Sequence, residues 1–159
     1  MATFSQIANA YRVALIMDAI DTSDLIAWAD SEIEASTIPP NALVDVSMGR
    51  KLPTAAMISH LTELADDEND SWSIQRGMSY VASCVRNGTM TIESAIMGCY
   101  RFLQSENLLY DDEFIMFVTY EDELSLIRDG IFGDDHLAQL RIDFLESLDE
   151  MANRTGNGG

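Results

Sequence analysis

Residues Trp72 to Leu103 read WSIQRGMSYVASCVRNGTMTIESAIMGCYRFL and carry the clearest helical pattern in the chain. Apolar residues recur every three or four positions in each half: Ile74, Met78, Val81 and Val85, then Ile92, Ala95, Ile96, Cys99 and Leu103. This period is that of a helix with one buried face. Between the halves, Arg86-Asn87-Gly88 has the composition of a helix end, and Thr91 is a typical N-cap. The stretch therefore predicts a helical hairpin in the middle of a helical core.

Four further helices are predicted before this hairpin. They run from Phe4 to near Ile20, from about Ser23 to Ala35, from Pro40 to Val46, and from Pro53 or Thr54 to near Leu64. Pro39-Pro40 must interrupt the chain, because proline lacks a backbone donor and restricts the residue before it. Trp28 is expected at the edge of the second helix, with its indole N–H bonded to a partner.

Two helices are expected after the hairpin. The first begins near Asp111 and continues through Leu124, although the aromatic segment from Phe114 to Tyr120 is also compatible with a strand. The last begins near Asp134, and the tail at 153–159 is expected to be disordered because it holds three glycines and no apolar anchor. No interior linker divides the chain. The sequence predicts an all-α, single-domain bundle of about seven or eight short helices over residues 1–152.

Charge is the dominant feature of the composition. The 159 residues include 27 acidic and 9 basic side chains, for a formal net charge of −18, and 47% are apolar. Such a surface repels nucleic acid and anionic lipid, because binding to either depends on Lys and Arg. A basic protein is the natural partner, while the alternative is that the acidity only confers solubility. With no signal peptide and no apolar run long enough to cross a bilayer, a cytoplasmic location is expected.

Three acidic clusters are the candidate partner-binding residues. The first cluster holds Asp66, Asp67, Glu68 and Asp70; the second holds Asp111, Asp112 and Glu113; the third holds Glu121, Asp122 and Glu123. The first is either a solvated loop, with Asp70 or Ser71 capping the next helix, or a docking site for Lys and Arg. Trp72, Tyr110 and Tyr120 are the candidate aromatic anchors beside these clusters.

The sequence offers little catalytic or metal chemistry. His60 and His136 lack the paired spacing of a helix-borne zinc site, and Cys84 and Cys99 fall on or beside the apolar stripes, where reduced core thiols are expected. No phosphate-binding loop is present. We therefore expect no metal, no cofactor and no catalytic residue. The alternative is a small enzyme that uses His60 or His136.

One resemblance adds a family. The segment Asp24-Leu25-Ile26-Ala27-Trp28-Ala29-Asp30, followed by Ile33, Pro39-Pro40 and Leu43-Val44-Asp45-Val46-Ser47, resembles the N-terminal half of small acidic bacterial immunity proteins of polymorphic toxin systems. Tyr120-Glu121-Asp122-Glu123-Leu124 is similar to their acidic C-terminal segments, and the similarity covers about a third of the chain. It implies a cytoplasmic protein that neutralises a cognate toxin, often a basic nuclease, through an acidic surface. Those surfaces vary with the toxin, so no binding residue is carried over.

The sequence thus favours a protein-binding module over an enzyme. Its most specific form is an immunity protein that neutralises a basic toxin. The alternative is a homo-oligomeric structural or regulatory helical protein without enzymatic activity.

Overall fold

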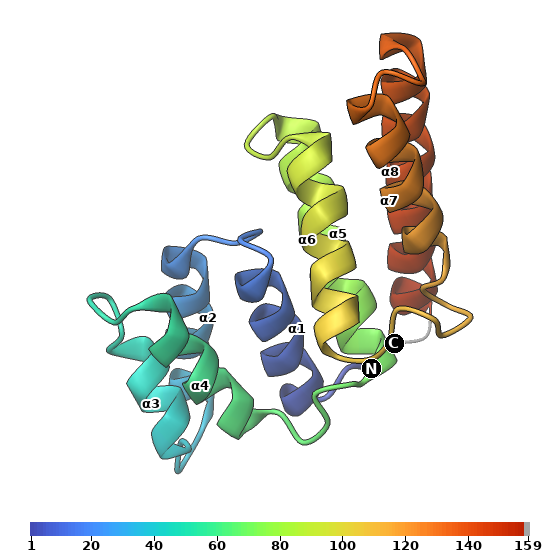
Figure 1. The fold of residues 1–159 in the computed structure, drawn as a ribbon. Coiled ribbons are helices and arrows are strands. Elements are labelled where there is room, and N and C mark those ends of the chain that lie inside the picture. Colours follow the sequence, from blue (N-terminus) through green and yellow to red (C-terminus); the bar gives the residue numbers. More distant parts are fainter. Residues whose placement is uncertain (158–159) are drawn as a thin grey trace.

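The computed structural model describes residues 1–157, which form eight helices (Figure 1). These are α1 (Phe4–Ile16), α2 (Thr22–Ala35), α3 (Asn41–Ser47), α4 (Thr54–Leu64), α5 (Ser71–Asn87), α6 (Ile92–Ser105), α7 (Met116–Arg128) and α8 (Asp134–Asn157). No strand occurs among the described residues, so the predicted all-α, single-domain fold is confirmed. The strand alternative for 114–120 is wrong, because Phe114 lies in a turn and α7 begins at Met116.

The buried side chains form two apolar clusters that share α1. The larger cluster joins α5, α6, α7 and α8 to Val13 and Ala14 of α1. The smaller one joins α2, α3 and α4 to Ala8 and Leu15, which share a different face of the same helix. Figure 1 shows this arrangement, with α1 beside α5 and the short helices α2, α3 and α4 on its other side. Helix α1 therefore lies between the two apolar clusters and contributes residues to both.

The predicted hairpin is α5 and α6, and every residue of its two apolar stripes is buried. Helix α5 is terminated by the cap residue Gly88, whose φ of 82° lies in the left-handed region that glycine adopts without strain. Thr91 then caps α6 by accepting a hydrogen bond of 3.1 Å from the backbone N–H of Ser94. The local signals in the sequence thus place the ends of both arms correctly.

Helices α1 and α5 approach each other closely at Gly77. A Cβ atom on Gly77 would lie 2.5 Å from Cγ1 of Val13 and 3.1 Å from the carbonyl oxygen of Ala10. Real side chains do not tolerate the first distance, so the missing side chain is what allows the two helices to pack at this spacing. Gly77 is buried in the interior of α5, where its low helix propensity is otherwise a disadvantage.

The first helix is shorter than predicted, because it ends at Ile16 and not near Ile20. Asp18 adopts a left-handed conformation with φ 56°, and the N–H of Ala19 bonds to the carbonyl of Ala14 at 2.8 Å. These contacts form a Schellman motif with Asp18 in the place where glycine is usual. The apolar period misled the prediction, because Ala19 is buried after the helix has ended.

Two further expectations are corrected. Trp28 does lie at the edge of the core, between the rings of Phe4 and Tyr11, but its buried indole N–H has no hydrogen-bond partner among the described residues.

The tail is not disordered from Asn153, because α8 continues through Asn157 and buries Thr155 to 5% exposure. The last two residues of that predicted tail lie outside the described part of the chain.

Replacing Gly77 by alanine should lower the free energy of unfolding by about 1–3 kcal/mol, because the added methyl group overlaps Val13. The matched control is Gly98→Ala in the interior of α6, where a Cβ meets nothing within 4 Å. That change should raise the same free energy by about 0.5–1 kcal/mol through helix propensity alone. Urea unfolding followed by circular dichroism measures both. Equal stabilisation by the two alanines would contradict the close approach of α1 and α5.

Candidate functional site

The backbone of the first acidic cluster is fastened to α1. Nδ2 of Asn9 donates to the carbonyl oxygens of Asp67 at 3.0 Å and Glu68 at 3.1 Å. The backbone N–H of Asp66 donates to Oγ of Ser5 at 2.6 Å. These contacts use backbone atoms of the loop, and the side chains of Asp66, Asp67 and Glu68 are all exposed. Oδ1 of Asp67 also accepts a hydrogen bond of 3.0 Å from the backbone N–H of Asn69. The backbone of the loop is therefore fixed by α1, while its carboxylates are exposed to solvent.

A buried arginine completes this attachment. Arg12 is only 4% exposed, and its Nε donates to Oδ1 of Asn9 at 2.8 Å. Its Nη2 donates to the carbonyl oxygen of Glu68 at 3.2 Å, and its Nη1 lies 3.9 Å from a carboxylate oxygen of Glu106 at the end of α6. A buried guanidinium is tolerated only when its donors find partners. Arg12 thus ties the first cluster and the end of α6 to one point on α1.

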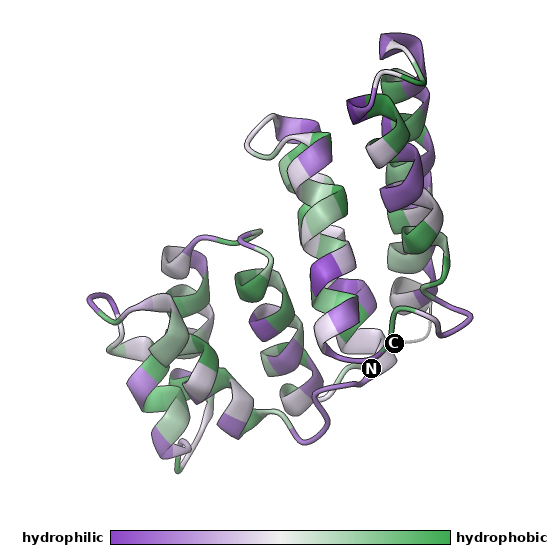
Figure 2. Cartoon of the chain, viewed as in Figure 1, coloured by the Kyte–Doolittle hydropathy of each residue, from purple (hydrophilic) through white to green (hydrophobic). Residues whose placement is uncertain are grey.

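The second acidic cluster reaches the same end of the molecule. The carboxylate of Glu113 accepts hydrogen bonds from Oγ of Ser71 at 2.7 Å and from Nε2 of Gln75 at 2.9 Å, both in α5. Asp70 caps the same helix by accepting from the N–H of Ser73 at 2.9 Å. The two clusters therefore meet at the N-terminus of α5, where the positive end of the helix dipole favours carboxylates. Figure 1 shows both loops near the two chain termini, and Figure 2 colours much of the first loop and the tip of the second as hydrophilic.

We call the exposed part of this surface the acidic end. It consists of Asp66, Asp67, Glu68, Asp111 and Asp112. Asp70 and Glu113, which the sequence analysis offered as partner-binding residues, are partly buried and serve as a helix cap and a link between loops. The carboxylates of Asp70 and Glu113 already accept hydrogen bonds from α5, so they are less available to a partner than the exposed carboxylates of the acidic end.

The third acidic cluster lies elsewhere, along α7. Glu121 accepts a hydrogen bond of 3.0 Å from Oγ of Ser125, and the carboxylate of Glu123 lies 3.9 Å from Nε2 of His136 in α8. Only Asp122 of this cluster is exposed, and it lies six residues into α7, about 9 Å along the axis from Met116. The structure therefore does not bring the third cluster into the acidic end.

Two of the three predicted aromatic anchors are not exposed. Nε1 of Trp72 donates to the carbonyl oxygen of Thr155 in α8 at 3.1 Å. The hydroxyl of Tyr120 bonds to Oγ of Ser147 in the same helix, and burial raises the pKa of this tyrosine. Both side chains join their helices to α8. Tyr110, beside the second cluster, is 75% exposed.

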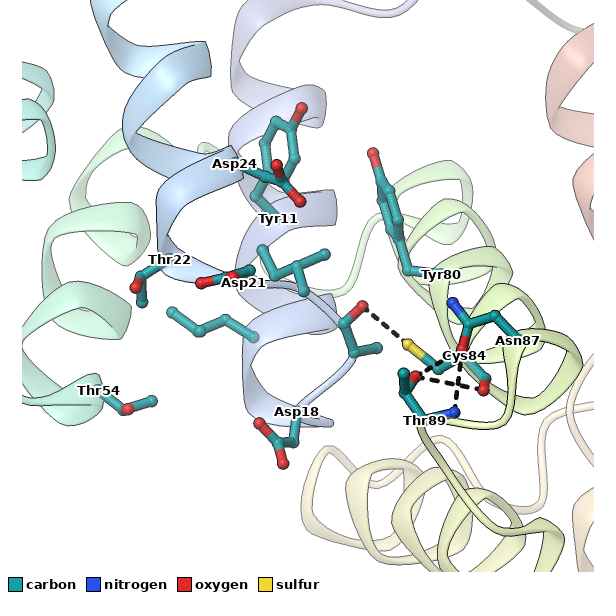
Figure 3. A pocket seen from close by; sticks show the side chains of 13 residues that line it. Tyr11, Asp18, Asp21, Thr22, Asp24, Thr54, Tyr80, Cys84, Asn87 and Thr89 are labelled. Atoms are coloured by element: carbon teal, nitrogen blue, oxygen red, sulfur yellow. Dashed lines mark hydrogen bonds between the residues drawn. The ribbon is translucent and has the colours of Figure 1, made fainter.

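A groove that the sequence analysis did not predict lies at the other end of α1 (Figure 3). It has a volume of about 730 Å³ and runs between the turn from α1 to α2 and one face of α5. Asp18, Asp21 and Asp24 line one side, while Tyr80 and Cys84 lie across from them. These residues come from segments about 60 positions apart, so no local motif could have indicated the groove.

The two thiols differ in their surroundings. Cys99 is fully buried, and this burial raises the pKa of its thiol to about 12. It matches the predicted core cysteine and is protonated at neutral pH. Cys84 is only partly buried, and its Sγ donates to the carbonyl oxygen of Ala19 at 3.2 Å across the groove.

Neither histidine belongs to a possible metal site in the described part of the chain. Nδ1 of His60 is 3.9 Å from the carboxylate of Asp45, and the ring of His136 stacks on Phe132 with 4.0 Å between centroids. Within residues 1–157, no group of three or more His, Cys, Asp or Glu side chains is placed to hold a metal ion. None of the helices described combines the length and the hydrophobicity that a bilayer-spanning segment needs.

Comparisons with family models, with curated proteins and with solved structures found no match for this chain.

Replacing the buried Arg12 by leucine should lower the free energy of unfolding by about 2–4 kcal/mol, because Oδ1 of Asn9 loses its donor and the carbonyl of Glu68 loses one of its two. It should also speed hydrogen exchange in the loop at 65–70, since the backbone is held less tightly. Arg101→Leu is the control, because Arg101 is exposed and should change stability by no more than about 0.5 kcal/mol. If both variants behave alike, Arg12 does not hold the acidic loop.

Proposed function

We propose that this chain is a protein-binding module that engages a basic protein through its acidic end. The observation that carries the proposal is the convergence of two acidic loops, which begin about 45 positions apart in the sequence, at the N-terminus of α5. Contacts from Asn9, Arg12 and Glu113 fix the loops there. Neither the segment 65–70 nor the segment 106–115 contains a lysine or arginine. Each loop therefore carries side-chain charge of one sign on a fixed backbone.

Such a surface acts mainly on the rate and the selectivity of encounter. A patch of one sign attracts a complementary patch, which raises the association rate, and this attraction weakens as salt screens it. Affinity requires buried contacts at the centre of the interface as well. Tyr110 and Ile115 offer these, because both are exposed and both flank the second cluster.

The finer proposal is that the partner is a toxin and the chain its immunity protein. Its support is the resemblance of residues 24–47 and 120–124 to bacterial immunity proteins, together with the overall charge of −18. Carboxylates on a fixed backbone would occupy the phosphate-binding surface of a basic nuclease and so block its substrate. A cytoplasmic site of action belongs to this proposal, because such toxins act inside the cell.

The test is capture of partners by the wild-type chain and by Asp66→Asn/Asp67→Asn/Asp111→Asn/Asp112→Asn. This variant removes four charges from the acidic end and keeps the shape of each side chain. The bait is exposed to a lysate of the source organism at 50 mM and at 500 mM NaCl. We expect the wild type to retain a basic protein at low salt and to release it at high salt, and the variant to bind at least tenfold more weakly.

The matched control removes four exposed carboxylates elsewhere, in Glu34→Gln/Asp129→Asn/Asp135→Asn/Glu146→Gln. It should retain the partner nearly as well as the wild type. Equal loss in both variants would show that only net charge matters and would overturn the proposal. A concentration-dependent mass without any heterologous partner would favour the homo-oligomeric module. For the toxin proposal, the captured protein must inhibit growth when expressed alone, and co-expression of the wild-type chain must relieve the inhibition.

A further inference from the structure

A second pocket follows the groove along the seam between α1 and α5, and we call it the seam pocket. Its lining is mostly apolar and comes from α1, α5 and the last turn of α8: Ile7, Ala10, Tyr11, Trp72, Arg76, Tyr80 and Thr155. Ile7 follows Ser5, which binds the acidic loop, by two residues, or about 200° around a helix. The seam pocket and the acidic end therefore lie on opposite sides of α1.

The walls of the seam pocket are fixed by contacts within the molecule. Nε1 of Trp72 donates to the carbonyl oxygen of Thr155 at 3.1 Å, which joins the indole to the last turn of α8. Thr155 is 5% exposed and Ala10 is 3% exposed, so both belong to the packed interior. The volume is about 360 Å³. Pre-formed cavities of about 300–1,000 Å³ with apolar walls and a few polar groups are typical small-molecule sites.

The two tyrosine rings meet the seam pocket with their edges. Tyr11 and Tyr80 stack on each other, with 5.9 Å between centroids. Trp28 packs against Tyr11 at 5.0 Å, and Cζ of Arg76 lies 5.9 Å from the centroid of Tyr80. Because these neighbours occupy the ring faces, a ligand contacts the ring edges. The edge of an aromatic ring carries the positive part of its quadrupole, so it favours an anion over a cation.

The charge of the lining has the same preference. Arg76 is the one charged side chain among the described residues that line the seam pocket, whereas the lining of the groove in Figure 3 includes three aspartates. Within the described part of the chain, Arg76 makes no ion pair. Burial raises the pKa of Tyr11 to about 12, so its hydroxyl is neutral and does not repel an anion. In a chain with 27 acidic residues, this pocket is complementary to an anion.

We propose that the seam pocket binds a small carboxylic acid with an apolar body, its carboxylate on the guanidinium of Arg76 and its body against the indole of Trp72. The planar guanidinium donates paired hydrogen bonds to a carboxylate, which fixes the orientation of the ligand. The apolar walls exclude water from the rest of the ligand and stabilise it by burial. The inference does not rest on the proposed function, because the acidic end takes no part in this site.

The test is an NMR titration of the 15N-labelled chain with 3-phenylpropanoate, and with the neutral 3-phenylpropanamide as the ligand control. We expect saturable shifts of the indole N–H signal of Trp72 and of the backbone amides of Ile7, Arg76 and Tyr80. The amide should bind about tenfold more weakly, because it lacks the charge-assisted hydrogen bonds. Arg76→Gln should weaken the carboxylate by about the same factor and abolish the difference between the two compounds.

The matched variant is Arg101→Gln, which removes an exposed arginine from α6 and should leave the titration unchanged. Glutamine has a helix propensity close to that of arginine and both positions are exposed, so both variants should stay folded. Absence of saturable shifts at Trp72, equal affinity for the two compounds, or equal loss in both variants would overturn the proposal. Failure of the capture experiment would leave this site in place, and failure of this titration would leave the acidic end in place.

Discussion

Helices α1 and α5 pack closely against each other, and residues of α1 contribute to both apolar clusters of the core. The close packing is possible only because Gly77 has no side chain where Val13 and Ala10 approach. Helix α1 also supplies Ala8 and Leu15 to the second apolar cluster, so its position relative to α5 fixes both halves of the core. The acidic end and the groove lie near opposite ends of this helix, and both are built across its contact with α5 or with the loop before α5.

Polar side chains of α1 hold the first acidic loop in place through Asn9 and Arg12. A buried arginine is costly, and Arg12 is compatible with the core because Asn9, the carbonyl of Glu68 and the carboxylate of Glu106 surround it. The same contacts hold the acidic loop by its backbone and leave its carboxylates in solvent. A flexible acidic loop would lose conformational entropy when it bound a partner, whereas a held loop has already lost most of it on folding.

The sequence predicts features that depend on neighbouring residues and misses those that depend on contacts between distant segments. The stripes, the glycine end of α5 and the N-cap of α6 are local, so the hairpin was predicted correctly. The early end of α1 was not predicted, because Asp18 takes the left-handed conformation that usually marks a glycine, and an aspartate gives no clear local signal for it. Trp72 and Tyr120 were wrongly expected at the surface, since their partners lie in α8. The capping role of Asp70 was one of two expectations for its loop and is local, whereas the link from Glu113 to α5 joins distant segments and was not predicted. The groove joins segments so distant that only the fold reveals it.

The most direct test of the central claim, that a folded acidic end docks a basic protein, is hydrogen exchange of the captured complex compared with the free chain. We expect slower exchange of backbone amides at 66–70 and 109–115 in the complex, with little change in the exposed parts of α2 and α3. Slower exchange confined to α2, α3 and α4, with the loops at 66–70 and 109–115 unaffected, would contradict it.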